Sequence, residues 1–155
     1  MPWGFIIKFA DDSKAGRVVD SAEDREAFQE MLDNLEKWSQ DWQLLFNRGK
    51  CKVMHFGKKN TRQEYTMGDH TLEAIKQEKD LGVLIEDNLK PSAQCAKAAA
   101  KANMVLGQLT WGCTWRDPEN LTELFKVYVR PHLEYAQASW SPWTQADIQT
   151  LEQVQ

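Results

Sequence analysis

Two adjacent carboxylates near the start of the chain have the residue type and spacing best suited to chemistry. Asp11 and Asp12 stand in the sequence Phe9-Ala10-Asp11-Asp12, directly after an apolar run. Hard divalent cations prefer such oxygen ligands. In phosphoryl transfer, a pair of these cations would activate an attacking hydroxyl and stabilise a leaving pyrophosphate, but they need carboxylates from several strands. Asp is also common wherever a chain reverses, so an ordinary turn is the alternative interpretation.

The residues around the carboxylates predict the element that positions them. Residues 4–10 are a short apolar run of β-forming residues, and residues 16–19 form a weaker extended stretch. This pattern predicts a β-hairpin with both aspartates at its tip and with a buried first strand. Residues 21–24 then give a helix start signal. The apolar positions that follow it at three- and four-residue spacing predict an amphipathic helix, and they are Phe28, Met31, Leu32, Leu35, Trp38 and Trp42.

Further strands and then helices are expected along the rest of the chain. The pattern predicts a strand at residues 51–56, a small hairpin over residues 65–75 and another strand at residues 80–86. Helices are expected to begin at Ser92, after the N-cap Asp117 and after Thr144. Pro131 is expected to break or kink the second of these helices, because proline lacks the N–H that a helix interior needs.

This order of elements predicts an α+β fold with a boundary near Lys90. Residues 1–90 are expected to form strands packed on one long helix, and residues 91–155 a helical bundle. The tryptophans could stack on unpaired bases, but they mostly coincide with apolar helix stripes and are expected to pack in the core and between helices. Cys51 and His55 share one strand face without a second pair of ligands at zinc spacing, so core packing is expected for them too.

Charge and cysteine content narrow the classes of protein that fit. The net charge of −4 argues against a protein that coats nucleic acid in general, because such proteins carry a strong basic excess. Charge is nevertheless segregated, since residues 47–63 hold six Lys or Arg and no acid. The three cysteines are widely spaced and odd in number, which favours free thiols in a reducing compartment. Without an apolar run long enough for a bilayer, an intracellular location, cytoplasmic or nuclear, is expected and no membrane contact.

Several motifs resemble, in the same order, those of LINE-type retrotransposon reverse transcriptases of the chicken-repeat and jockey-like groups. Phe9-Ala10-Asp11-Asp12-Ser13 resembles the (Tyr/Phe)-x-Asp-Asp motif of these enzymes, with Ser13 where a threonine would be expected. The other matching segments are residues 35–38, 46–52, 79–83 and 129–135. The resemblance covers about residues 8–155. It implies a partial polymerase palm of hairpin, short antiparallel strands and one long helix, followed by a helical, thumb-like segment.

The resemblance also implies roles for individual residues. Asp11 would be the metal-binding aspartate of the polymerase motif and Asp12 its supporting neighbour, with Mg²⁺ or Mn²⁺ as the cofactor. Phe9 would pack beneath the primer end. Lys50 would approach the phosphates of the incoming nucleotide, although a solvated strand edge guarded by lysine is the alternative. The hairpin with Leu81 and Gly82 would contact the primer, although Gly82 could instead mark a bulge.

The implied function is that of an RNA-directed DNA polymerase fragment. Its parent enzyme would act on an RNA template and a DNA primer, and its other catalytic aspartate and its fingers precede the Phe9-to-Asp12 motif in the family. This chain is expected to lack them, and hence to be inactive alone unless the remaining fingers and palm of the same element join it. The alternative is a non-catalytic remnant that binds nucleic acid or protein.

Overall fold

The computed structural model describes residues 4–112 and 117–154 and has the α+β fold that the sequence predicts. It separates into two compact units, Met1–Lys76 and Gln77–Gln155, which are described one at a time. The division therefore falls earlier than the boundary expected near Lys90. The reason is that the hairpin preceding this lysine packs against the first long helix of the second unit and belongs to that unit.

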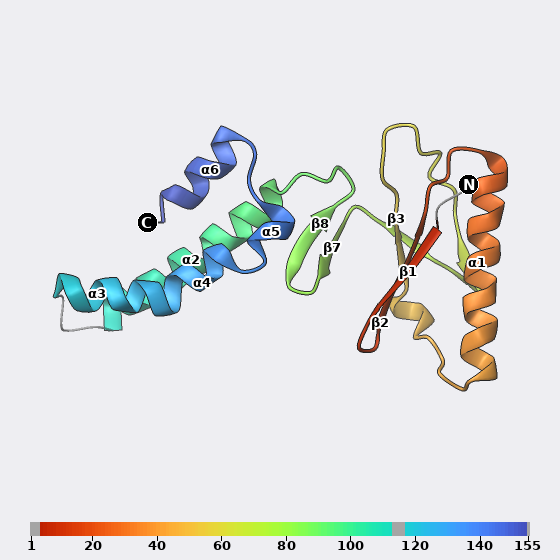
Figure 1. Ribbon diagram of the computed structural model, residues 1–155, viewed down its shortest axis with the longest axis horizontal. Coiled ribbons are helices and arrows are strands. Elements are labelled where there is room, and N and C mark those ends of the chain that lie inside the picture. Colours follow the sequence, from red (N-terminus) through yellow and green to blue (C-terminus); the bar gives the residue numbers. More distant parts are fainter. Residues whose placement is uncertain (1–3, 113–116, 155) are drawn as a thin grey trace. The chain divides into compact units, whose positions relative to one another are not determined.

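The first unit begins with the expected β-hairpin (Figure 1). Strands β1 (Gly4–Phe9) and β2 (Asp12–Arg17) pair in antiparallel register from Gly4 opposite Arg17 to Phe9 opposite Asp12. The connecting turn is Ala10-Asp11, with Ala10 at a φ of 52°. Both aspartates therefore lie at the tip, as predicted.

The expectation that the first strand is buried is wrong. All residues of β1 are exposed, and Phe5, Ile7 and Phe9 keep 55%, 55% and 62% of their surface accessible. Side chains alternate across a strand, so these three share one face. The opposite face of β1 lies toward the helix at residues 22–41. Ile6 on this face lines a shallow groove together with residues of that helix. Among the described residues β1 pairs with β2 alone, so no further strand helps to bury it.

Helix α1 (Ala22–Asp41) packs between this hairpin and the core of the first unit. Ser21 and Asp24 form a capping box, in which the serine hydroxyl accepts from the Asp24 N–H at 3.1 Å and the aspartate accepts from the Ser21 N–H at 3.1 Å. On the hairpin side Lys8 Nζ lies 4.2 Å from the ring centroid of Trp38. On the other side lies an apolar cluster of Leu32, Val53, Tyr65, Met67 and Leu72.

Short strands complete the first unit. After the 3-10 helix η1 (Arg48–Lys50) come β3 (Lys52–Met54), β4 (Thr66–Met67), β5 (His70–Thr71) and β6 (Glu73–Ile75). Strands β4 and β5 form a small hairpin that is shorter than the one expected over residues 65–75, because residues 73–75 pair with β3 instead. Strands β3 and β6, however, pair in parallel, which corrects the expectation of antiparallel strands throughout. Gln29 ties β4 to α1, because its side-chain amide exchanges two hydrogen bonds of 3.0 Å with the backbone of Thr66.

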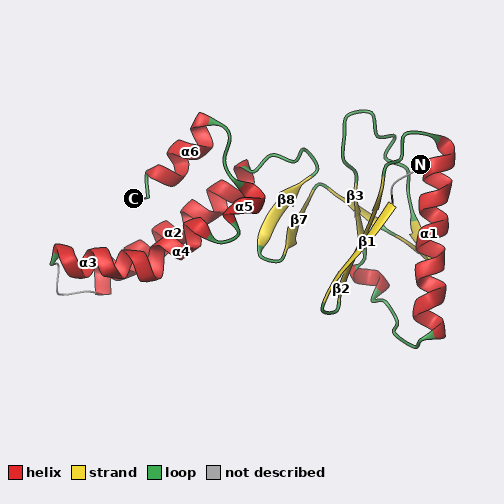
Figure 2. Ribbon diagram, in the orientation of Figure 1, coloured by secondary structure: helices red, strands yellow, loops and turns green. Residues whose placement is uncertain are grey.

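The second unit is one hairpin followed by helices (Figure 2). The hairpin comprises β7 (Gln77–Asp80) and β8 (Val83–Glu86), so residues 81–82 form a turn within the single strand expected at residues 80–86. The helical elements are α2 (Ser92–Gly112), α3 (Pro118–Leu124), η2 (Phe125–Val129), α4 (Arg130–Glu134), α5 (Gln137–Trp140) and α6 (Gln145–Glu152). Helix α2 contacts β8, η2, α4 and α6.

The core of the second unit follows the helical periodicity. Along α2, Cys95, Ala98, Ala99 and Ala102 are buried, with partly buried leucine and valine side chains continuing the stripe. Pro131 does not break the chain into separate helices. Instead the turn before it, η2, is a π-helix, which widens the backbone where the proline ring would otherwise clash.

The tryptophans depart from the expected core packing. Trp140 is buried, but Trp42, Trp111 and Trp143 expose 68%, 93% and 69% of their surface, and Trp115 lies outside the described residues. Within the described ranges no helix combines the length and apolar character needed to cross a membrane.

Candidate functional site

The tip of the β1–β2 hairpin brings three of the predicted site residues together. Phe9 ends β1, Asp11 lies in the turn, and Asp12 begins β2 directly opposite Phe9. Directly paired residues of an antiparallel hairpin project to the same face, so Phe9 and Asp12 share the side that faces away from α1. All three side chains are exposed. The tip therefore offers two carboxylates and an aromatic side chain at the end of a two-stranded hairpin.

The two carboxylates are suitable ligands for a divalent metal ion, but they supply only part of its coordination shell. Carboxylate oxygens suit Mg²⁺ or Mn²⁺. Across residues 4–112 and 117–154, no three His, Cys, Asp or Glu side chains gather into a group that could hold a metal ion. Cys51 and His55 form no such group, and His55 instead packs over the ring of Tyr65, with the ring centroids 6.1 Å apart. Burial lowers the pKa of His55 and raises the pKa of the Cys51 thiol.

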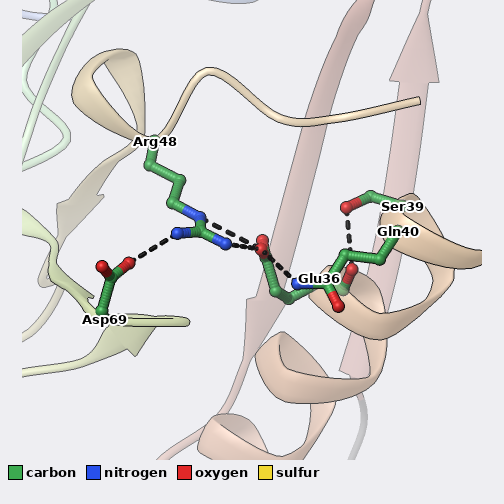
Figure 3. Close-up of polar contacts among 5 residues, drawn as sticks. All are labelled: Glu36, Ser39, Gln40, Arg48 and Asp69. Atoms are coloured by element: carbon green, nitrogen blue, oxygen red, sulfur yellow. Dashed lines mark hydrogen bonds and ion pairs between the residues drawn. The ribbon is translucent and has the colours of Figure 1, made fainter. Parts of the chain in front are cut away.

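Lys50, the predicted phosphate contact, is the last residue of η1 and is exposed. Its neighbour Arg48 is held in place by polar contacts, which Figure 3 shows. Arg48 Nε donates to Glu36 Oε1 at 3.0 Å and a second guanidinium nitrogen forms an ion pair with the same carboxylate. The third nitrogen contacts Asp69 Oδ1 at 2.5 Å. These bonds, above all the one to Glu36, raise the pKa of Arg48.

The carboxylate of Glu36 is the central hydrogen-bond acceptor of this network. Glu36 is 6% exposed, and its Oε1 also accepts from Gln40 Nε2 at 3.1 Å. The network joins α1, η1 and the β4–β5 turn, where Gly68 has a φ of 61° and leaves room for the guanidinium. A Cβ at Gly68 would lie 3.0 Å from Arg48 Cζ.

Sequence reasoning missed this network. Glu36 appears in the sequence as one acid among seven in residues 20–36, all expected on the solvated side of the helix. A helical position count could have given a signal, because Glu36 is four residues after the buried Leu32 and therefore lies on the same face.

Leu81 and Gly82, the predicted primer contacts, form the turn of the β7–β8 hairpin in the second unit. Both have positive φ, 44° for Leu81 and 91° for Gly82. Tyr135 Oη donates to the Leu81 carbonyl at 2.9 Å, and Lys97 Nζ donates to the Gly82 carbonyl at 3.0 Å. A Cβ at Gly82 would lie 3.0 Å from a ring carbon of Tyr135. Gly82 therefore lies in a tight turn that packs against Tyr135, and it does not form a β-bulge.

Comparison of the chain with protein-family models, with curated proteins and with solved structures gave no match in any of the three.

Proposed function

We propose that the chain is the C-terminal palm and the beginning of the thumb of a LINE-type RNA-directed DNA polymerase. The observation that carries this proposal is the hairpin tip, where Asp11 and Asp12 project from a tight turn with Phe9 on the face of Asp12. A second support is the order of the motifs along the chain, from the Asp-Asp turn to residues 129–135. The enzyme of which this piece is a part would join deoxynucleotides to a primer on an RNA template.

Asp11 and Asp12 would hold Mg²⁺ or Mn²⁺ together with an aspartate from outside the described residues. When bound, the metal ions lower the charge that builds up on the attacking hydroxyl and on the leaving pyrophosphate. The hairpin contributes by holding Asp12 on its paired backbone and Asp11 in the adjoining two-residue turn, so that both carboxylates lie close together for an ion. Phe9 supplies an apolar surface beside them for the end of the primer.

Lys50 would offer its charge to the phosphates of the incoming nucleotide. The ion pairs of Arg48 support this role, because they occupy the guanidinium and leave the exposed ammonium two residues later for an outside anion. A lysine in such a place can offset negative charge or give a proton to the departing pyrophosphate.

The test is calorimetric titration of the full chain with MgCl₂ and with MnCl₂. The proposal expects weak binding by the natural sequence and its loss in the double variant Asp11→Asn/Asp12→Asn. A matched control is Asp20→Asn/Asp41→Asn, which removes the same charge from two exposed aspartates outside the β1–β2 hairpin. Equal loss in both double variants would mean that the ion responds to net charge and would contradict a site at the tip.

The second candidate function is a non-catalytic remnant that binds nucleic acid or protein. The observation that favours it is the incomplete ligand set, since among the described residues no third metal-ligating side chain joins the two aspartates. This candidate expects no metal binding by the natural sequence and no primer extension. Extension recovered by adding the remaining palm and fingers of the same element would exclude it.

A further inference from the structure

The turn between β7 and β8 has a conformation that its own residues do not favour. A two-residue turn with positive φ at both positions is ordinarily built from Asn-Gly or Asp-Gly. Here the first position is Leu81 at a φ of 44°, a conformation in which a side chain with a Cβ is crowded. Leu81 also keeps 47% of its surface exposed, so burial of an apolar side chain does not account for it.

Contacts from outside the hairpin hold this turn instead. Tyr135, which follows α4, donates to the carbonyl of Leu81, and Lys97 on α2 donates to the carbonyl of Gly82. A third contact fixes the start of β8, because Gln94 Oε1 accepts from the Leu84 N–H at 2.9 Å. Both carbonyls of the turn are thus bound by side chains from two different elements.

These contacts join two of the segments on which the family resemblance rests. Residues 79–83 contain the turn, and residues 129–135 end at the tyrosine that bonds to it. The ring of Tyr135 also covers Gly82, where a Cβ would come within 3.0 Å of it. With the glycine covered in this way, Leu81 is the exposed apolar side chain that the turn offers to a ligand.

We infer that Tyr135 and Lys97 are positioning residues that fix the Leu81–Gly82 turn so that Leu81 contacts the primer strand. This inference rests on the proposed polymerase function, and it assigns roles to two residues that the family motifs left without one. Neither residue touches the primer, so each acts only through Leu81.

The experiment measures how tightly the full chain binds a fluorescent DNA primer annealed to an RNA template with a recessed 3′ end. Tyr135→Phe removes only the hydroxyl, and Lys97→Met replaces the ammonium-bearing side chain with an uncharged one of similar length. Each is expected to weaken binding by about threefold to tenfold, the range for loss of one hydrogen bond. The matched controls Tyr128→Phe and Lys101→Met alter exposed side chains of the same types in the same unit and are expected to change nothing.

A double-mutant cycle with Leu81→Ala separates positioning from direct contact. If Tyr135 acts through Leu81, the double variant Leu81→Ala/Tyr135→Phe binds no more weakly than Leu81→Ala alone. The salt dependence of binding also stays the same in Lys97→Met, because a lysine that bound a phosphate would change that slope by about one. The melting temperature of each variant shows whether it is still folded.

The possible results distinguish the positioning roles of Tyr135 and Lys97 from the proposed polymerase function on which they rest. Binding by the natural sequence with additive effects of Leu81→Ala and Tyr135→Phe, or with no effect of Leu81→Ala, overturns the inference and leaves the polymerase assignment standing. No binding of the duplex by the natural sequence overturns both, since a primer contact is then absent.

Discussion

Glu36→Gln is the substitution that most directly tests how the first unit holds η1. It keeps the size of the side chain and one acceptor oxygen, but it removes the buried charge that faces Arg48 (Figure 3). Glu36 is 6% exposed, and its Oε1 receives two guanidinium N–H groups and one amide N–H. The substitution removes the ion pair, because the amide oxygen that would face the guanidinium carries no charge.

The expected loss of stability follows from these bonds. An exposed ion pair contributes about 0.2–1 kcal/mol, and removing one partner of a buried pair costs about 3–5 kcal/mol. The Arg48 side chain is 35% exposed, and solvent screens part of the charge interaction. For Glu36→Gln we therefore expect a loss of about 1–2 kcal/mol from the free energy of unfolding of the first unit.

The assay is urea unfolding followed residue by residue by NMR, which separates the first unit from the second. With a denaturant slope of about 1 kcal/mol per molar for a unit of this size, the midpoint of the first unit should fall by about 1–2 M. The second unit serves as an internal reference. Glu26→Gln is the matched control, because it makes the same chemical change at an exposed position of α1. Equal midpoints for the two variants would refute the reasoning that the buried carboxylate holds η1.

Three further predictions concern the same unit. Ser21→Ala removes the serine hydroxyl from the capping box and should cost about 1 kcal/mol in thermal unfolding. Because the bond from the Ser21 hydroxyl lowers the pKa of Asp24, part of this cost should be present above about pH 4 and be lost as the pH falls further, whereas the part due to the bond from the Asp24 N–H should remain. Burial lowers the pKa of His55, so stability should decline as the pH falls below the ordinary histidine pKa of about 6.5, and His55→Gln should remove that slope in equilibrium unfolding. Gly68→Ala should lower the melting temperature, because alanine is strained at this positive φ and its Cβ would crowd the guanidinium of Arg48. An unchanged melting temperature would show that the β4–β5 turn can shift to make room for the Cβ.

Local patterns predicted the elements well where the signal lies within a few residues. The start of α1 at Ser21, the hairpin around the aspartates and the stripe of small residues along α2 depend on spacings of two to four residues. The same short spacing predicted that Asp11 and Asp12 lie at the tip of one hairpin, independently of the rest of the fold. These features are confirmed.

Other features could not be predicted because they depend on which distant segments meet. The parallel pairing of β3 with β6 joins residues 52–54 to residues 73–75, and the sequence of neither strand specifies its partner. The exposure of β1 was missed for the same reason, since an apolar strand is buried only if other elements cover both its faces.

The sequence by itself determined the hairpin that carries Asp11 and Asp12 and the helix that begins after Ser21. Only the tertiary structure decided how Glu36 pairs with Arg48 and how Tyr135 and Lys97 bind the turn at Leu81 and Gly82. Helix and hairpin signals are local because backbone hydrogen bonds and side-chain periodicity link near neighbours. Contacts across 12 or 54 residues form only when packing of whole segments offsets the entropy of closing the chain between them.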